Sequence, residues 1–488
     1  MTDTSTTVIP TAPAEQAVRG GPVVDTPITE ELAAFCNGLS YDGLPAEALE
    51  AARRFALDFS GVALRGSLEP SSRVAAEAVT RLAPVGPVGS TMIGYSGRTT
   101  PQYAALLNGT SLHGLELDDT HPEGGIHIGG TVFATAFAVA ERVGATGADV
   151  LTAAVAGYEV AGRLAMALPL TAHAAHGFHS TGTCGVFAAA VVASRLLGLT
   201  TGQMVNALGI AGSQTAASLE YRTEGAWTKR LHPGWAAHSG IVAAELARAG
   251  FTGPHRIIEG RAGFLRSYSD SPKPEIVLAG IGEDYQVLHT AMKIHSACRH
   301  SQAALDGVLD IVLRHDIRPD DVERIRIGIF RNALTSVAEP EARKRRPQTV
   351  IDAQFNIFFA AAAAILWRRV TVADYTPDCL NDPALLALID RVDCAADPEL
   401  DNLFPRLWPA KVEIALKDGR SFETRVDHPR GDPENPVSWG EVVAKFAGLT
   451  TGLLSDTRRS EAIAAMDGFA DAPVTRFTHL LALDRTAA

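Results

Sequence analysis

The chain has 488 residues, of which 46% are hydrophobic and 20% are charged, and its formal net charge is −12. This length provides for two or three domains with ample cores, and this composition excludes a disordered chain. The negative balance argues against a nucleic-acid partner, although a locally basic pocket can still bind an anionic substrate. We interpret the one short basic run, Arg343–Arg346, as a solvated loop or as a partner of internal carboxylates.

Targeting and redox signals point to the cytoplasm. Five scattered cysteines without a CxxC spacing are typical of free thiols in a reducing compartment, and they offer no zinc or iron–sulfur pattern. Residues 1–27 are rich in Thr, Pro and Ala, and we expect them to form a disordered tail without a signal peptide. Apolar stretches such as Phe358–Trp367 reach about half of the ~20 residues of a membrane span, so no membrane partner is expected.

Residues 28–290 carry helical periodicity, and we predict a large all-helical unit there. Strand-like alternation of useful length is absent from this part of the sequence. The run from Leu199 predicts a helix with Thr200 or Thr201 as its N-cap. The clearest earlier helical runs, of which the second and third are apolar nearly all round and therefore expected to be buried, are Pro45–Val62, Gly147–Met166 and Thr183–Leu197.

The pattern changes near Pro272–Gly282, and residues 291–430 read as a smaller α/β unit. Val322–Phe330 alternates apolar and polar residues as a half-buried strand does. Lys411–Val426 predicts a hairpin that turns at Asp418–Gly419, and Asp352–Val370 predicts a buried helix between the two strand regions.

Helical spacing then returns in residues 431–488, in Trp439–Phe446 and Thr457–Met466. We therefore expect the α/β unit to be inserted into, or packed beside, the helical one. A groove between two such units is a common ligand position.

A dense charged segment, His113–Gly130 (HGLELDDTHPEGGIHIGG), interrupts the apolar helices. Burying its four acids and three histidines is unfavourable unless each group is paired, so we interpret it as a loop that moves protons. A solvated loop with capping acids is the simpler alternative. Metal binding by a set drawn from this loop is less favoured, because two of its histidines lie outside any regular ligand spacing; the set is His113, Glu116, His121 and His127.

A second charged segment is Arg222–Gly234 (RTEGAWTKRLHPG). Lys229 stands beside Arg230 and His232, and neighbouring cations together with partial burial predict a lowered pKa, which suits a general base or acid. Lys229 and Arg230 are also candidates to bind substrate carboxylates. The alternative is a surface turn before a helix over Gly234–Ala247.

Two further segments carry polar side chains. In Lys293–Asp306 (KIHSACRHSQAALD) we expect substrate contacts rather than a Cys298 nucleophile, because residues two apart on a helix do not face one another. His176–Gly185 (HGFHSTGTCG) offers an anion site at a helix N-terminus or an ordinary cap. The sequence shows no Walker A or Rossmann fingerprint, so no nucleotide cofactor is expected.

These motifs in order resemble the MmgE/PrpD superfamily, which covers 2-methylcitrate dehydratase, cis-aconitate decarboxylase and iminodisuccinate epimerase. The runs that carry the resemblance are NGTSLHGLELDDTHPEGGIH, GFHSTGTCG, GAWTKRLHPGWAAHSGIVAAELARAGFTGP and ACRHSQAALD. The resemblance implies a mostly α fold, in which residues 28–290 and 431–488 form one helical domain and residues 291–430 form an α/β lid. It also implies a homodimer, a small carboxylate substrate and no metal or organic cofactor.

The resemblance also assigns residues. Glu116 falls at an acidic position of the decarboxylase branch, His127 matches the loop histidine, and Lys229 matches the active-site lysine of KRLHPG. Asp118, Asp119 and Thr120 match the family's DDT portion. Gln302 stands where decarboxylases have a histidine, although His300 is two residues away, and Phe358 stands where they have a tyrosine.

Our hypothesis from the sequence is a dehydratase-type lyase that acts on a small di- or tricarboxylate by proton transfer beside a carboxylate. The alternatives are an epimerase, a cis-aconitate-type decarboxylase and a carboxylate-binding paralogue without turnover. The expected catalytic residues are His127 and Lys229, on opposite faces of the substrate carbon, with Asp118 as the orienting acid. The expected substrate contacts are Glu116, Asp119, Thr120, His179, Arg230, Arg299, His300 and Gln302. His113 and His121 are expected to be structural.

Overall fold

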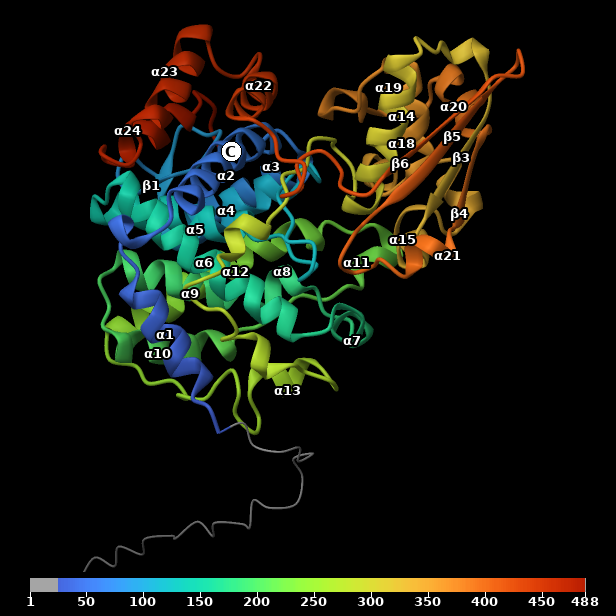
Figure 1. The fold of residues 1–488 in the computed structure, drawn as a ribbon. Coiled ribbons are helices and arrows are strands. Elements are labelled where there is room, and N and C mark those ends of the chain that lie inside the picture. The colour runs from blue at the N-terminus through green and yellow to red at the C-terminus, as the bar shows by residue number, and fades with distance from the viewer. Residues whose placement is uncertain (1–24, 488) are drawn as a thin grey trace, which may run out of the picture.

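The computed structural model describes residues 25–487 and is mostly α-helical with two small sheets (Figure 1), which confirms the predicted fold class. The expected tail, residues 1–27, lies outside the described residues except for its last three. Two hydrophobic cores organise the chain. The first, which we call the helical body, draws on residues 28–294 and 437–483, and the second, the α/β unit, draws on residues 297–426.

Helices from both chain ends build the helical body, and α22–α24 pack beside the N-terminal helices in Figure 1. Its helices are α1 (Ile28–Gly38), α2 (Ala46–Gly66), α3 (Pro70–Leu82), α4 (Pro101–His113), α5 (Gly129–Val143), α6 (Gly147–Ala167), α7 (Leu170–Ala175), α8 (Ser180–Thr183), α9 (Gly185–Leu196), α10 (Thr201–Gly212), α11 (Tyr221–Glu224), α12 (Thr228–Arg248), α13 (Phe264–Tyr268), α22 (Trp439–Thr450), α23 (Asp456–Asp467) and α24 (Thr475–Thr478). A two-residue ribbon, β1 (Ser90–Thr91) with β2 (Arg98–Thr99), is an addition that sequence periodicity does not reveal.

Local sequence signals explain several helix boundaries. The predicted cap at Thr200 is confirmed. Its hydroxyl accepts a hydrogen bond from the Gln203 backbone N–H, and the Gln203 side-chain oxygen accepts one from the Thr200 backbone N–H. The apolar helices α6 and α9 are buried on nearly all sides, as predicted. By length and composition, the 21-residue α6 is long and apolar enough to cross a membrane. It is longer than the apolar stretches noted in the sequence, which reach about half of a membrane span. Its most apolar window is 94% buried inside the protein.

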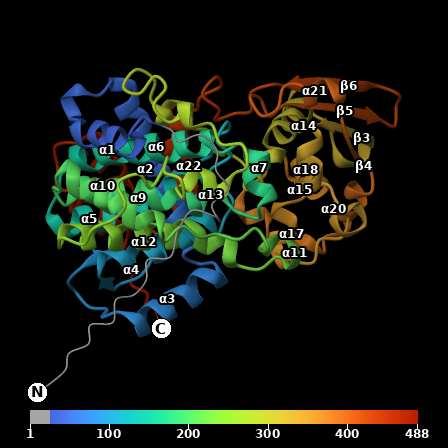
Figure 2. The same ribbon diagram turned by 90° about the horizontal axis from the view of Figure 1, so that it is seen from below.

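The α/β unit contains one four-stranded sheet in the order β4-β3-β5-β6. Strand β3 (Val322–Ile329) pairs parallel to β4 (Val392–Ala396) and antiparallel to β5 (Ala410–Leu416), and β5 forms the predicted hairpin with β6 (Ser421–Val426). Gly419 has a φ of +89°, the backbone that such a turn requires. Helices cover one side of the sheet, as Figure 2 shows; those of the unit are α14 (Gln302–Arg314), α15 (Arg331–Val337), α16 (Glu341–Lys344), α17 (Val350–Gln354), α18 (Ile357–Trp367), α19 (Pro377–Leu380), α20 (Pro383–Ile389) and α21 (Pro398–Asp401).

Two helix predictions need correction. The helix expected over Gly234–Ala247 begins at Thr228, so the second charged segment lies partly on α12, with Pro233 inside the helix rather than before it. The single helix expected over Asp352–Val370 is two helices, α17 and α18. Asn356 separates them because its extended backbone and its side chain, which accepts the Phe359 amide, begin a new helix.

Glycines let α12 pack closely against α4 in the helical body. A Cβ on Gly234 would lie 2.2 Å from the Leu106 carbonyl oxygen, and one on Gly109 would lie 2.8 Å from the Gly234 Cα. Both obstacles are backbone atoms, so they cannot move aside as the end of a side chain can. This close contact fixes the start of α12, which carries Lys229, against the helix that leads into the charged loop.

We therefore predict that Gly234→Ala lowers stability by about 1–3 kcal/mol through overpacking. The matched control is Gly448→Ala in α22, where a Cβ would meet nothing within 4 Å and where Ala is the better helix former by about 0.5–1 kcal/mol. Thermal unfolding of both variants checks this. Equal melting temperatures for the two would contradict the packing argument.

Candidate active site

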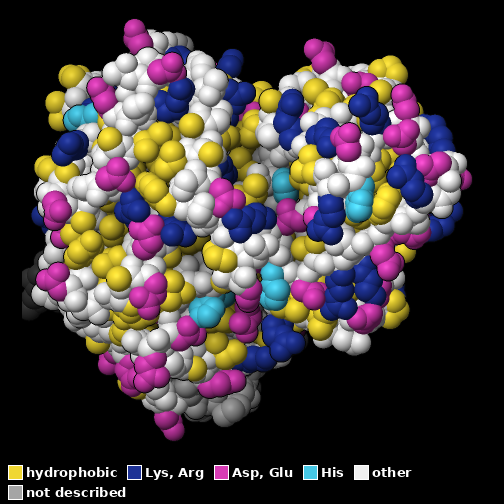
Figure 3. All heavy atoms as spheres, turned by 45° about the horizontal axis from the view of Figure 1, so that its top comes forward, with side chains coloured by type: hydrophobic (Ala, Val, Ile, Leu, Met, Phe, Trp, Pro, Cys, Tyr) yellow, Lys and Arg dark blue, Asp and Glu magenta, His cyan; other side chains and the backbone are white. Residues whose placement is uncertain are grey.

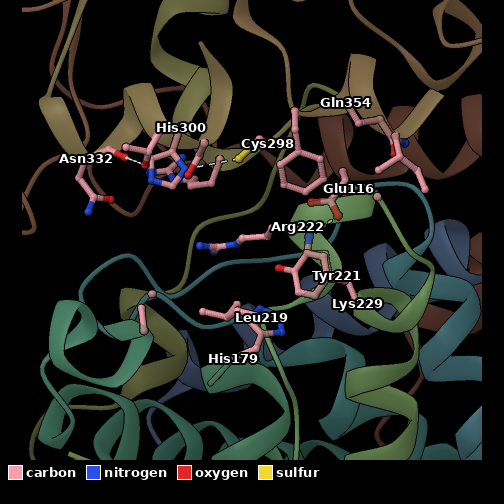
Figure 4. Close-up of a pocket in the computed structure, with 18 of the residues that line it drawn as sticks. Glu116, His179, Leu219, Tyr221, Arg222, Lys229, Cys298, His300, Asn332 and Gln354 are labelled. Carbon is pink, nitrogen blue, oxygen red and sulfur yellow. Dashed lines mark hydrogen bonds and ion pairs between the residues drawn. The ribbon is translucent and has the colours of Figure 1, made fainter. Parts of the chain in front are cut away.

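A pocket of about 300 Å³ lies between the helical body and the α/β unit. Figure 3 shows the hollow between the two lobes, and Figure 4 shows side chains that line it. Most of the predicted site residues line this pocket, namely Glu116, Thr120, His127, His179, Lys229, Arg230, Arg299 and His300. The other three, Asp118, Asp119 and Gln302, are absent from its lining and lie behind it.

The charged loop between α4 and α5 is buried, not solvated, and nearly every acid in it has a partner. Asp119 accepts the Gly129 amide at 2.9 Å and the Tyr158 hydroxyl at 2.5 Å, so it caps the start of α5. A Cβ on Gly129 would lie 2.8 Å from the Tyr158 hydroxyl oxygen and 2.9 Å from Asp119 Oδ2, so a side chain there would collide with both groups. Burial raises the pKa of Asp119 to about 7. Asp119 is thus placed as a structural anchor of the loop and does not reach the pocket as a substrate contact.

His127 is held as a neutral base. Its Nδ1 lies 2.7 Å from the Asp119 carbonyl oxygen and 3.1 Å from Thr120 Oγ1. A carbonyl oxygen only accepts, so Nδ1 carries the proton and Nε2 keeps its lone pair. Burial lowers the pKa of His127 to about 3, although Asp118, 3.4 Å away, opposes that shift. At neutral pH the ring is therefore neutral, with an unprotonated Nε2.

Asp118 lies outside the pocket lining and contacts two histidines, His113 and His127. Its Oδ2 lies 2.6 Å from His113 Nδ1, and its Oδ1 lies 3.5 Å from the ammonium of Lys293. Burial alone would raise the pKa of Asp118, but His113 first and also Lys293 hold it well below its usual value. Its carboxylate thus lies beside both histidine rings, and its role in orienting His127 stays a prediction from the sequence. His113 and His121 are fully buried with partners of their own, Asp118 and Gln286.

Lys229 and Glu116 form a buried ion pair at the pocket wall. Burial alone would lower the pKa of Lys229, but the Glu116 carboxylate outweighs burial and raises it. Burial likewise would raise the pKa of Glu116, which Lys229 and Lys293 instead lower to about 2. The lowered lysine pKa predicted from the neighbouring cations is therefore wrong. Lys229 is therefore an ammonium, because the acidic groups around it, with Glu116 first, outweigh the effect of burial.

The remaining lining from the helical body is His179 and Arg230. His179 Nδ1 lies 2.9 Å from His232 Nδ1, so one ring donates to the other, and burial lowers the pKa of both histidines. Arg230 lies 3.2 Å from Glu69 Oε2 and 3.0 Å from Ser71 Oγ. Its guanidinium is thus already bonded within the protein at the pocket edge.

The α/β unit contributes Arg299, His300 and Cys298. Arg299 is paired with Asp432 at 2.5 Å, on the segment that returns to the helical body. Burial lowers the pKa of His300 to about 3 and raises that of the Cys298 thiol, so the 3.4 Å Cys298–His300 contact joins two neutral groups. Gln302 donates to the His295 and Ala297 carbonyls. Its amide is bonded within this segment and Gln302 does not line the pocket, whereas His300 does.

Several residues that shape the pocket were missed from the sequence. Lys293 was inside a quoted motif, but only the fold shows that it bridges Glu116 and Asp118. The ring centroid of Phe355 lies 4.7 Å from the Lys229 Nζ. Phe355 stands between α17 and α18, where the sequence predicts one continuous helix. Arg222 begins the second charged segment yet was assigned no role. Arg343 and Lys344 of the basic run also line the pocket.

Potential metal ligands do not converge in the charged loop. Glu116 faces two lysines and His121 turns to Gln286, so the four-residue set considered from the sequence is not one site. Within residues 25–487 the group of suitable side chains that does come together is His428, Asp432 and Glu434. Asp432 there is paired with Arg299, a cation that disfavours a metal ion.

Comparison with known proteins places the chain in a family. The MmgE/PrpD N-terminal domain matches residues 30–277 and the MmgE/PrpD C-terminal domain matches residues 295–468. The cis-aconitate decarboxylase-like protein oryM of Aspergillus oryzae is 29% identical over 88% of this chain and 92% of its own length. Cis-aconitate decarboxylases of Aspergillus terreus and Homo sapiens are 26% and 28% identical, over 89% and 88% of this chain and 91% and 89% of their own lengths. The chain belongs to the MmgE/PrpD family.

Proposed function

We propose that this protein is a lyase of the MmgE/PrpD type that acts on a small tricarboxylate related to cis-aconitate. The observation that carries the proposal is the pairing of protonation states in one pocket: a neutral His127 and a protonated Lys229. The names of the relatives support the substrate class, and this chain matches each relative over nearly its whole length. Both groups belong to the protein itself, and in the proposed chemistry they contribute proton transfer and charge.

Decarboxylation of such a substrate needs one proton donor. The bond between a carboxylate carbon and the neighbouring methylene breaks, CO2 leaves, and the electron pair forms a new C=C bond to the central carbon. The electrons of the original C=C bond take a proton at its outer carbon. Lys229 is the group that supplies this proton, and its charge stabilises the anion that develops beside it.

Dehydration uses the same pair in a different way. His127 Nε2 takes a proton from the carbon next to a carboxylate, the electron pair forms the C=C bond, and hydroxide leaves with the proton of Lys229. The fixed Nδ1–H tautomer of His127 is what makes Nε2 a base in this step. Both reactions are lyase reactions. Homodimer formation and a cytoplasmic location stay predictions from the sequence.

A substrate panel in deuterated water tests the proposal. We expect proton NMR to show turnover of cis-aconitate or a hydroxy-tricarboxylate, with one solvent deuteron placed on carbon if the reaction is decarboxylation. His127→Asn, which keeps a polar side chain of similar size, is expected to abolish dehydration and to leave part of a decarboxylation. Deuterium exchange into a dicarboxylate alone would indicate an epimerase. Binding of the acids without turnover of any would indicate a non-catalytic paralogue.

A pH profile tests the role assigned to Glu116. Glu116→Gln removes the main interaction that raises the pKa of Lys229 and leaves burial, which lowers it, so Lys229 loses its proton at lower pH. We predict that the basic limb of kcat/KM moves to lower pH by about 1–3 units, the range for an opposite charge at close distance. Glu399→Gln on the surface is the control, with no displacement expected. An unmoved limb in Glu116→Gln would show that Lys229 is not the acid.

A further inference from the structure

Arg222 is one of the cations that line the pocket. It lies on the short helix α11, lines the pocket and is exposed, and Figure 4 shows its side chain between His300 of the α/β unit and Leu219 and His179 of the helical body. Within residues 25–487 no hydrogen bond or ion pair of its guanidinium is found. An arginine in such a place is a donor of up to five hydrogen bonds that the fold itself leaves unused.

The other cations that line the pocket are already bonded inside the protein. Lys229 is paired with Glu116, Arg230 with Glu69, Arg299 with Asp432 and Arg343 with Asp352, and the Lys344 ammonium donates to the Ser336 and Phe355 carbonyls. Each of the four ion pairs places a carboxylate beside its cation, which cancels most of the attraction for a substrate anion. Arg222 therefore keeps its full attraction for an anion that enters the pocket.

The surroundings of Arg222 favour an anion. His300, which Figure 4 shows on the α/β-unit side of Arg222, is kept neutral first by burial and then by the Arg222 charge, so it can donate or accept a hydrogen bond without adding a charge of its own. Asn332, whose side chain is hydrogen-bonded to His300, also lines this part of the pocket. Glu339 is the opposing charge, a carboxylate on the exposed rim of the pocket with no ion pair to Arg222.

We propose that Arg222 binds the substrate carboxylate that lies farthest from the reacting carbon, and that it thereby selects tricarboxylates over dicarboxylates. This rests on the proposed function and adds a specificity-determining residue to it. The pocket then has two ends, a chemical end at the Lys229–Glu116 pair and a recognition end that Arg222, His300 and Asn332 line. A carboxylate and a guanidinium can form two parallel hydrogen bonds, which a lysine at the same place cannot reproduce.

Calorimetric binding of two unreactive acids tests the inference without requiring turnover. Propane-1,2,3-tricarboxylate carries three carboxylates on a saturated chain, and glutarate carries two. For Arg222→Gln we expect Kd for the tricarboxylate to rise by about 10- to 100-fold, the range for one charge-assisted interaction, with little change for glutarate. For Arg222→Lys we expect a Kd for the tricarboxylate between that of the unaltered protein and that of Arg222→Gln. The control, Arg314→Gln in α14, removes a surface charge and is expected to change neither Kd.

The outcomes separate this inference from the function on which it rests. An equal loss of affinity for both acids, or no loss for the tricarboxylate, would overturn the role of Arg222 while leaving the lyase proposal in place. A double variant, Arg222→Gln with Glu339→Gln, that binds the tricarboxylate as tightly as the unaltered protein would show that the arginine only offsets the charge of the rim carboxylate. That result would also overturn the inference. If the unaltered protein binds neither acid, the proposed function itself fails and the inference falls with it.

Discussion

One buried row of alternating charges, Lys229–Glu116–Lys293–Asp118, holds the site together. All four side chains are nearly inaccessible to solvent, so each charge is stable only because the next one is opposite in sign. At one end the row keeps Lys229 protonated. At the other end Asp118 contacts His113 and His127, and the low pKa of His127 leaves a neutral ring. An acid and a base can therefore coexist in the same pocket at neutral pH.

The same row joins distant parts of the fold. Lys293 lies at the junction between the helical body and the α/β unit, and its ammonium also donates to the Glu116 carbonyl at 3.3 Å. Lys445 of α22 donates to the Lys293 and Leu117 carbonyls and is paired with Asp58 of α2. Helix α22 thus contacts the charged loop, and the core of the helical body includes residues from both ends of the chain.

Features with local signals were predictable from the sequence, and features made by distant contacts were not. The Thr200 cap and the Asp418–Gly419 hairpin depend on residues a few positions apart, and both predictions are confirmed. Lys229 and Glu116 are 113 positions apart, so adjacent cations suggested a lowered lysine pKa when the true partner raises it. Residue type identified the charged segments, but it did not reveal that Gln302 turns to backbone carbonyls while His300 and Arg222 line the pocket.

The central claim is a statement about protons: Lys229 carries a charge, and His127 is neutral with its proton on Nδ1. Neutron diffraction from a deuterated crystal at pH 7 observes this directly. The account predicts three deuterons on the Lys229 Nζ, one on His127 Nδ1 and none on His127 Nε2. A neutral Lys229 amine, or a deuteron on His127 Nε2, would contradict it.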